Sequence, residues 1–250
     1  MKFLLKYLCF LPILPVFSAF GNIQDDITFR MLRNTYTEKE KSTSVKLSNK
    51  GERSYLVQGS MELLDEKIGN ELITGKKEEI PFIITPPLFK LEPKQSYSWR
   101  VMFSGDSAKL PADRESLYIA KFRLIPATTK PTIADGVNSE LSVINVVATK
   151  IYYRPIAFEK LEIKNEISNL KFKIDGDDLV VTNNSPIYMA FDEVSVNSVP
   201  VDSKELYKPL IPKSEQRFKL PKKVSPSGNK IEWAVLDEFA MPTPKSTTKI

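Results

Sequence analysis

Apolar and polar residues alternate along most of the chain, in short segments that turn residues separate. The stretch "VKLSNKGERSYLVQGSMELL" is typical, because a turn cluster at 48–51 ends one alternating run before another begins at Tyr55. Such alternation indicates strands with one buried face. In the first part of the chain it predicts strands at residues 26–34, 42–49, 55–64, 79–85, 96–103, 116–126 and 139–153.

The same pattern restarts after Arg154 and Pro155. Proline fixes its own φ and cannot donate to a ladder, so Pro155 suits a short stiff hinge. Residues 202–210 could form a single helical turn, no segment favours a long helix, and the last ten residues allow at most one short strand. The predicted strands of this second part are 157–163, 170–174, 178–183, 188–196, 206–211, 215–220 and 230–236.

Two series of evenly spaced strands predict an all-β protein with two immunoglobulin-like β-sandwich domains, residues 22–153 and 154–250. A chain of 250 residues is long enough for two domains, and a hydrophobic content of 42% is enough for packed cores. The low glycine count of 9 and the high proline count of 18 also favour strands and turns over helices.

The N-terminal segment "MKFLLKYLCFLPILPVFSAFG" has the organisation of a signal peptide. Lys2 and Lys6 form the positive region, residues 8–17 the apolar region, and residues 19–21 a small-x-small cleavage site. The apolar region is shorter than the ~20 residues of a membrane span. We therefore predict that residues 1–21 are removed on export. Cys9 leaves with them, so the mature protein depends on core burial rather than on disulfides.

The composition limits the kinds of catalytic and metal site that the chain can form. The chain has no histidine and its one cysteine lies in the predicted signal peptide, which excludes Ser-His-Asp and Cys-His sites and His-based zinc sites. We expect no cofactor and no metal. Loss of Lys2 and Lys6 lowers the net charge from +5 to +3, a mild and dispersed excess that, with export, argues against nucleic-acid binding. Carboxylate catalysis stays open, for example a glycosidase that uses Asp113 and Glu115.

The stretch "SELSVINVVATKIYYRP" is unusually long and apolar for one strand, and Lys150 interrupts it. In such a strand a lysine is ordinarily a solvated edge charge. Side chains alternate between the two faces of a strand, and one face must serve the domain's own core. One face carries Leu141, Val143, Asn145 and Val147, and the other carries Ile144, Val146 and Ala148.

Several segments together resemble the periplasmic pilus chaperones of the chaperone–usher pathway, the PapD-like family. The combination of "LPADRESLY" with "KIYYRP" is the most specific part of the resemblance, and the matches follow one another in order over nearly the whole mature chain. The other matching segments are "ITPPLFKLEP", "RLIPA", "NNSPIYMAF" and "LIPKSEQ".

The resemblance implies two immunoglobulin-like domains arranged as an L with a cleft between them. Such a chaperone binds a pilus (fimbrial) subunit that lacks its last strand and completes the subunit's sheet with its own edge strand, without ATP. It then delivers the subunit to an outer-membrane usher. The family therefore implies a periplasmic location, pilus subunits and an usher as partners, and a possible self-dimer of the free protein.

The resemblance assigns Lys150 and an arginine on the first strand to the subunit's C-terminal carboxylate. Arg33 falls at the family's arginine position, and Arg30 is the alternative. Two cations in a shielded cleft form charge-assisted bonds to one carboxylate and so set the register of the inserted strand. The arginine can bind in a bidentate manner, whereas the lysine is a point charge.

Counting from the lysine, the family's subunit-facing residues are Leu141, Val143 and Asn145, with Val147 on the same face and Val137 as an extension. Asn145 departs from the family pattern, which has a large apolar residue there. We expect the opposite face, with Ile144, Val146 and Ala148, to pack in the protein's own core.

The resemblance also implies an interdomain ion network of Glu115, Arg154 and Asp237, and a cis proline in the turn Thr85-Pro86-Pro87. The segment 128–138 is longer than in the short-loop branch of the family, yet the chain lacks the cysteine pair of the long-loop branch, so the branch stays open. Two other functions compete with the chaperone: an exported immunoglobulin-like structural or adhesive fimbrial module, and the carboxylate-based enzyme. Both lack a use for paired cations beside an apolar strand.

Overall fold

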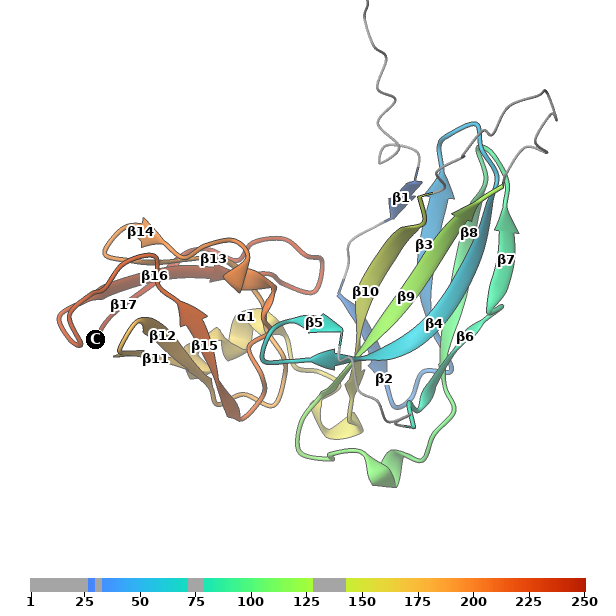
Figure 1. The fold of residues 1–250 in the computed structure, drawn as a ribbon. Helices are drawn as coiled ribbons and strands as arrows, with labels where there is room; N and C mark the ends of the chain where they lie inside the picture. Colours follow the sequence, from blue (N-terminus) through green and yellow to red (C-terminus); the bar gives the residue numbers. More distant parts are fainter. Residues whose placement is uncertain (1–26, 30–32, 72–78, 128–142) are drawn as a thin grey trace, which may run out of the picture.

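Two β-sandwiches follow one another along the chain and meet at an angle, which gives the molecule a bent outline (Figure 1). The structure is a computed structural model, and it describes residues 27–29, 33–71, 79–127 and 143–250. The predicted signal peptide, Arg30, Val137 and Leu141 lie outside these residues. The only α-helix in the described part is α1 (Ile163–Glu166), so the predicted all-β class is confirmed.

The first sandwich consists of two sheets. In the described residues one sheet has the strand order β1 (Ile27–Phe29), β3 (Thr43–Asn49), β8 (Ser96–Phe103) and β6 (Phe82–Thr85). The other has the order β2 (Asn34–Thr37), β10 (Asn145–Arg154), β9 (Ser116–Pro126), β4 (Tyr55–Asp65) and β5 (Asn70–Glu71), with β7 (Leu88–Leu91) paired to β4. A 3-10 helix, η2 (Ser107–Lys109), lies between β8 and β9.

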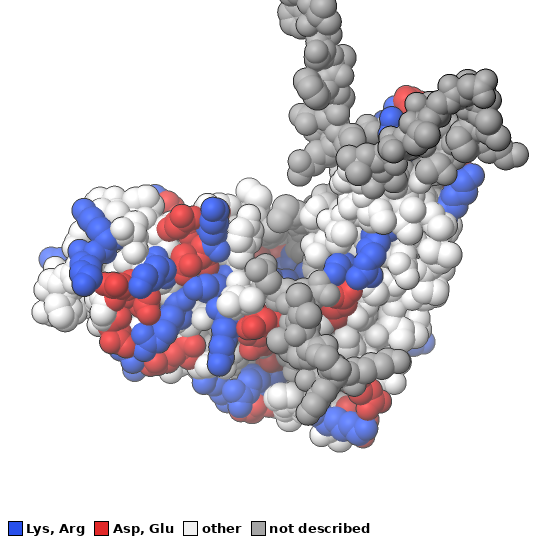
Figure 2. Space-filling model, viewed as in Figure 1, with Lys and Arg blue, Asp and Glu red and all other residues white. Residues whose placement is uncertain are grey.

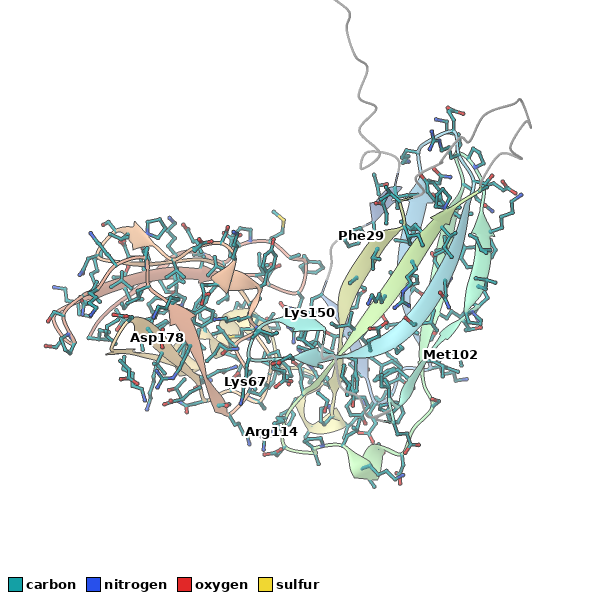
Figure 3. The ribbon with its side chains drawn as sticks, in the orientation of Figure 1. Phe29, Lys67, Met102, Arg114, Lys150 and Asp178 are labelled. Atoms are coloured by element: carbon teal, nitrogen blue, oxygen red, sulfur yellow. The ribbon has the colours of Figure 1, made fainter. Side chains whose placement is uncertain are left out.

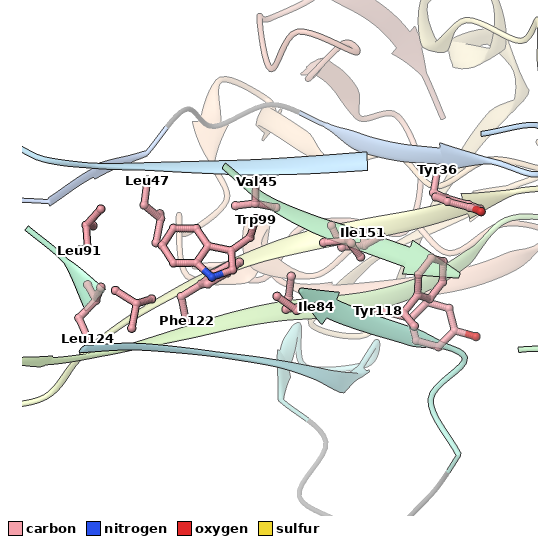
Figure 4. Packing of buried hydrophobic residues seen from close by; sticks show 14 of the residues in the cluster. Tyr36, Val45, Leu47, Ile84, Leu91, Trp99, Tyr118, Phe122, Leu124 and Ile151 are labelled. Atoms are coloured by element: carbon pink, nitrogen blue, oxygen red, sulfur yellow. The ribbon is translucent and has the colours of Figure 1, made fainter. Parts of the chain in front are cut away.

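Alternation along these strands builds the core between the two sheets. Trp99 on β8 and Phe122 on β9 are completely buried, with ring centroids 5.3 Å apart (Figure 4). Leu47 on β3 and Ile151 on β10 add to the same cluster. Such an arrangement, with every second side chain turned inward, is what strands with one buried face require.

The N-terminal strand changes sheets. Its first part, β1, pairs antiparallel with β3, and its second part, β2, runs parallel to β10 with Ile151 opposite Asn34. On its other side β10 pairs antiparallel with β9 from Asn145 to Tyr153. Within the described residues the β2 side of β10 is therefore paired from Ile151 onward and is open from Asn145 to Lys150.

The second sandwich is smaller. In the described residues one sheet has the order β11 (Leu170–Asp175), β12 (Asp178–Asn183) and β15 (Ser214–Lys219). The other has the order β14 (Val199–Pro200), β13 (Phe191–Val196), β16 (Lys230–Val235) and β17 (Ser246–Lys249). Its core includes Leu179, Phe218 and Trp233. Figure 2 shows Lys and Arg interspersed with Asp and Glu over this domain. Arg217 and Asp175 form one ion pair of this domain, at 2.6 Å.

Two predicted strands of the second part are wrong. Residues 157–163 form η3 (Ile156–Phe158) and lead into α1 and η4 (Ile167–Asn169), because Ile163 is buried as the first residue of a helical turn. Residues 206–211 contain η5 (Glu205–Tyr207) and one isolated bridge from Leu210 to Met189, because Pro209 has no N–H for a ladder. The single turn expected at 202–210 is present.

The shorter elements β5, β7 and β14 escaped prediction because two to four residues show too little alternation. The Thr85–Pro86 bond is cis, as the turn motif predicted.

A small apolar cluster joins the two domains. Leu117 and Tyr152 of the first domain and Tyr188 of the second are nearly fully buried in it, and the rings of Tyr152 and Tyr188 lie 5.8 Å apart. Leu64 and Ile119 complete the buried cluster, against which Ile211 packs. The domains thus share apolar surface in addition to the chain connection.

Candidate functional site

Arg33 and Lys150 are brought together by strand pairing. Ile151 lies opposite Asn34, so the preceding residues of the two parallel strands, Lys150 and Arg33, are neighbours where β2 begins to cover β10. The side chain of Asn34 donates from Nδ2 to Thr149 Oγ1 at 2.9 Å and ties the two strands together at this point. The structure therefore places both predicted cations at the end of the open stretch of β10.

Arg33 is held from two directions. Its Nη2 donates to Glu115 Oε2 at 2.5 Å, and its guanidinium carbon lies 3.7 Å from the centre of the Tyr152 ring. Only 6% of the side chain is exposed. Burial lowers the pKa of Arg33, but the charge of Glu115, the hydrogen bond to it and the neighbouring Tyr152 together outweigh burial, and the net shift of the pKa is upward. The Nε atom is buried and has no hydrogen-bond partner in the described part of the chain.

Glu115 is the centre of an interdomain ion network. Its Oε1 accepts from Arg154 Nε at 2.7 Å, and its Oε2 also accepts from the backbone N of Tyr188 at 2.8 Å. Arg154 donates through Nη1 to the carbonyl of Leu161 at 2.8 Å, while its Nη2 is buried without a partner among the described residues. One buried carboxylate thus faces two buried guanidinium groups, from Arg33 beside β2 and from Arg154 at the end of β10, and the backbone amide of Tyr188 in the second domain.

Asp237 does not belong to this network, contrary to the sequence prediction. Its Oδ1 accepts from the backbone N atoms of Phe239 and Met241, at 2.8 and 2.9 Å, and closes its own turn. In the described part of the chain it forms no ion pair with Arg154. The third member is Arg33, so the predicted carboxylate anchor and the predicted ion network are one connected cluster.

Lys150 is partly buried at the domain junction (Figure 3). Its Nζ donates to the backbone carbonyl oxygen of Tyr207, in the second domain, at 3.2 Å. Burial and the nearby charge of Arg33 lower the pKa of Lys150 to about 8. The ammonium is therefore largely protonated at pH 7, next to a cluster with two guanidinium groups for one carboxylate. This local excess of positive charge can accept an anion.

The open stretch of β10 exposes apolar side chains. Val143, just before the strand, and Ile144 are 50% and 51% exposed, and Val146 is 49% exposed. Asn145 is partly buried, and Val147 packs against the core of the first sandwich.

The expected core packing of Ile144, Val146 and Ala148 is therefore wrong. Asn145 and Val147 lie opposite Leu124 and Phe122, on the face that also carries buried Ile151 and Tyr153. The expected core residues share the opposite face with Lys150 instead. The sequence missed this because both faces of the stretch are apolar, so alternation alone does not say which one is inside.

Sequence reasoning also missed Tyr152 and Tyr188, which enclose the cluster from the two domains. Tyr152 has the same strand parity as Lys150, and that parity was the available signal. Tyr188 had no comparable signal, because its position depends on the docking of the second domain.

Comparison with known proteins agrees with this arrangement. Residues 26–159 match the family described as pili and flagellar-assembly chaperone, PapD N-terminal domain, and residues 165–246 match the C-terminal domain of the pili assembly chaperone PapD. The chain belongs to the PapD family of pilus assembly chaperones. As a member of that family it is a chaperone and not an enzyme.

Individual relatives cover most of the chain. The chaperone protein FanE of Escherichia coli is 32% identical over 187 residues, which is 75% of this chain and 74% of FanE. The chaperone protein FimC of E. coli K12 is 27% identical over 228 residues, 91% of this chain and 86% of FimC. The solved complex of the Salmonella enterica SafA pilin with the SafB chaperone matches with a TM-score of 0.74 and 25% identity, over 90% of this chain and 96% of that chain.

The carboxylates of the enzyme alternative have other roles in this chaperone fold. Glu115 is engaged by two arginines, and Asp113 lies on the surface with Arg114 at 3.0 Å and Lys213 at 3.4 Å. Arg114 lowers the pKa of Asp113. Among the described residues no cluster of acidic, cysteine or histidine side chains could hold a metal ion. Nor does any helix in the described ranges have the length and apolarity of a membrane span.

Proposed function

We propose that this protein is a periplasmic chaperone that caps pilus subunits by lending them the open edge of β10. The observation that carries the proposal is the position of that edge. An apolar, half-exposed strand, unpaired on one side from Asn145 to Lys150 in the described residues, ends at two neighbouring cations, Arg33 and Lys150. No ATP is required, because strand pairing itself supplies the binding energy.

The edge can complete the sheet of a subunit that lacks a strand. Backbone N–H and C=O groups of β10 would pair with the subunit, and alternate side chains would fill its open groove. An uncovered apolar sheet edge invites aggregation, so capping protects the subunit until assembly. We assign the face of Leu141, Val143, Asn145 and Val147 to the groove, with Asn145 against a polar or shallow part of it. Val143 on this face is half-exposed, and Val147, which packs on the chaperone's own core, would lie where that core meets the groove.

The cations would bind the C-terminal carboxylate of the subunit. Arg33 gives one nitrogen to Glu115 and has a further buried Nε without a partner in the described part. Lys150 gives one N–H to Tyr207 and has three in all. A carboxylate at this point would balance the local excess of positive charge and fix the register of the inserted strand.

The remaining partners and boundaries belong to the same proposal. The solved complex of a pilin with the SafB chaperone supports a subunit as the partner of β10. We further propose delivery to an outer-membrane usher, and self-pairing of the open edge in the absence of a subunit. Residues 1–21 would be the export signal, and residues 22–153 and 154–250 the two domains, joined at Arg154 and Pro155.

The test is capture of the subunit in the protein's own host. Tagged protein is isolated from the periplasm, and a secreted pilus subunit that is one strand short is expected in a 1:1 complex. Lys150→Ala and Arg33→Ala should each lose this subunit to degradation. Lys46→Ala, an exposed lysine on β3, is the matched control and should retain it.

Because Arg33 also stabilises Glu115, the melting temperature of each variant is measured in parallel. If both variants fold and still protect the subunit as well as the wild type does, the carboxylate anchor is wrong. If the wild-type protein carries no subunit at all, the chaperone function itself is wrong.

A further inference from the structure

The turn between β4 and β5, residues 66–69, reaches across to the second domain. The phenol oxygen of Tyr188 donates to the carboxylate of Glu66, and Gln216 Nε2 donates to the backbone carbonyl of Glu66 at 2.6 Å. Gln216 is 5% exposed and also donates to the Pro209 carbonyl at 3.1 Å. The turn is therefore anchored on Tyr188 and Gln216 of the second domain.

Gly69, the last residue of this turn, packs directly against the backbone of Tyr207. A Cβ atom at Gly69 would lie 2.6 Å from the Tyr207 carbonyl oxygen and 2.9 Å from the Lys208 nitrogen. The φ angle of Gly69 is +77°, which side chains rarely adopt. Any residue larger than glycine would therefore have to push the Tyr207 carbonyl away.

That same carbonyl accepts the hydrogen bond from Lys150 Nζ at 3.2 Å. The Tyr207 side chain plays no part in this contact and is 67% exposed. A lysine side chain has a flexible stem and a compact ammonium with three N–H groups, so one fixed acceptor restrains its direction and leaves two donors. The contact thus orients the ammonium without using up its capacity to bind an anion.

We propose that the turn 66–69 and the backbone carbonyl of Tyr207 position the Lys150 ammonium for the subunit carboxylate, so that the second domain is part of the anchor site. This inference rests on the function proposed above. It makes Gly69 a positioning residue that acts on the anchor through two backbone contacts. Affinity for a subunit then depends on how the two domains dock, although both anchoring cations belong to the first domain.

Gly69→Ala tests the inference without altering either cation. Gly228→Ala is the matched control, because Gly228 has a φ of +78° and a Cβ atom added there would meet no atom within 4 Å. The subunit obtained in the capture experiment is refolded with an equimolar mixture of wild-type and variant protein, and mass spectrometry gives the share bound to each. Loss of one preorganised side chain predicts a loss of affinity of about 3- to 10-fold for Gly69→Ala, and no change for Gly228→Ala.

The deciding measurement repeats the competition between Lys150→Met and the double variant Lys150→Met/Gly69→Ala, at protein concentrations high enough for the weaker Lys150→Met complex to form in vitro. If Gly69 acts through the ammonium, Gly69→Ala causes no further loss there, since neighbouring effects in one pathway are not additive. An equal loss in both backgrounds, or an unchanged affinity in the wild-type background, overturns the inference. Absence of binding by the wild type would instead overturn the proposed function. If Gly69→Ala does not fold, Gly69→Asn and Gly228→Asn carry the same comparison, because asparagine tolerates positive φ.

Discussion

At the scale of single residues, Glu115 lies at the centre of the junction. It is 1% exposed and forms ion pairs with two guanidinium groups that are themselves buried. Removal of one member of such a network leaves charges without compensation in a poorly solvated site.

We expect Glu115→Gln to lower the free energy of unfolding by about 3–5 kcal/mol. Urea denaturation at pH 7 measures the change. Glu52→Gln is the control, because Glu52 pairs with Lys94 at 2.6 Å on the surface with 82% of its side chain exposed, and its loss should leave the midpoint unchanged. Equal midpoints for the two variants would contradict the central role of Glu115.

We expect Lys150 to lower the stability of the free protein and to strengthen its binding of the subunit. The folded protein holds its pKa at about 8, below the ordinary value of 10.5, so the charged form is disfavoured by folding. The loss of folding stability that results from the lowered pKa is fully present below pH 8. It is relieved as the pH rises from 8 to 10.5, where the unfolded state binds more protons than the folded state.

Lys150→Met should therefore melt at a higher temperature than the wild type at pH 7, while it binds the subunit more weakly. The gain should shrink as the pH rises from 8 to 10.5. Melting curves over this range, with Lys46→Met as the exposed control, check the prediction. A variant that is less stable than the wild type at pH 7 would show that Lys150 stabilises the free protein.

Single residues also mark the limit of sequence reasoning. The pairing of Glu115 with Arg154 and the location of Arg33 near Lys150 were implied by the resemblance to the pilus chaperones, whose motifs these residues match. The link between Arg33 and Glu115 was not, and Asp237 was assigned in its place. Which cation meets a buried carboxylate depends on strand register and domain docking, and no local pattern reports either.

At the scale of elements, the two faces of β10 have different surroundings. The face with Val147 contributes to the core, and the face with Val146 is open to solvent. Its end was predicted to within one residue, because β-branched runs are strong strand signals, whereas the strand begins at Asn145, six residues after the predicted start. The assignment of the faces was not predicted correctly, because it depends on β9, where Phe122 and Leu124 fix the inner side.

The two faces of β10 can be separated by matched valine substitutions. Val147→Thr should lower both the melting temperature and the yield of the subunit complex, because Val147 packs on the core and belongs to the proposed groove-filling face. Val146→Thr, at a half-exposed neighbour, should leave stability unchanged and affect the complex less. Thermal melts and the competition assay measure both. A larger loss of complex for Val146→Thr would move the groove-filling face to Ile144 and Val146.

At the scale of the whole molecule, the two sandwiches are coupled by a small apolar cluster and by the ion network beneath it. Tyr188 contributes to both, through its buried ring and through its backbone N–H to Glu115. Its side chain also reaches Glu66 of the interdomain turn. The restart of the strand pattern predicted two domains. Their mutual orientation could not be predicted, because it depends on side-chain contacts at the junction.

Tyr188→Ser is expected to uncouple the domains. The ring and the phenol are lost from the junction, so calorimetry should resolve two unfolding transitions where the wild type shows one. Tyr207→Ser is the control, because that ring is 67% exposed and only the backbone of Tyr207 is used. Two transitions in the wild type as well would show that the domains unfold independently without any substitution.

The position of β2 also limits the length of a guest strand on β10. Because β2 runs parallel to β10 and starts at Asn34, it occupies the same edge that a guest strand would follow from the other end. A guest strand parallel to β10 would lie in line with β2 and would have to stop before Arg33. The free length of the edge therefore fixes where the last residue of the guest strand can lie. A guest chain that continued by even a short tail would collide with β2. We therefore expect the molecule to bind a chain whose C-terminus lies beside Arg33 and to reject a chain that continues past this point.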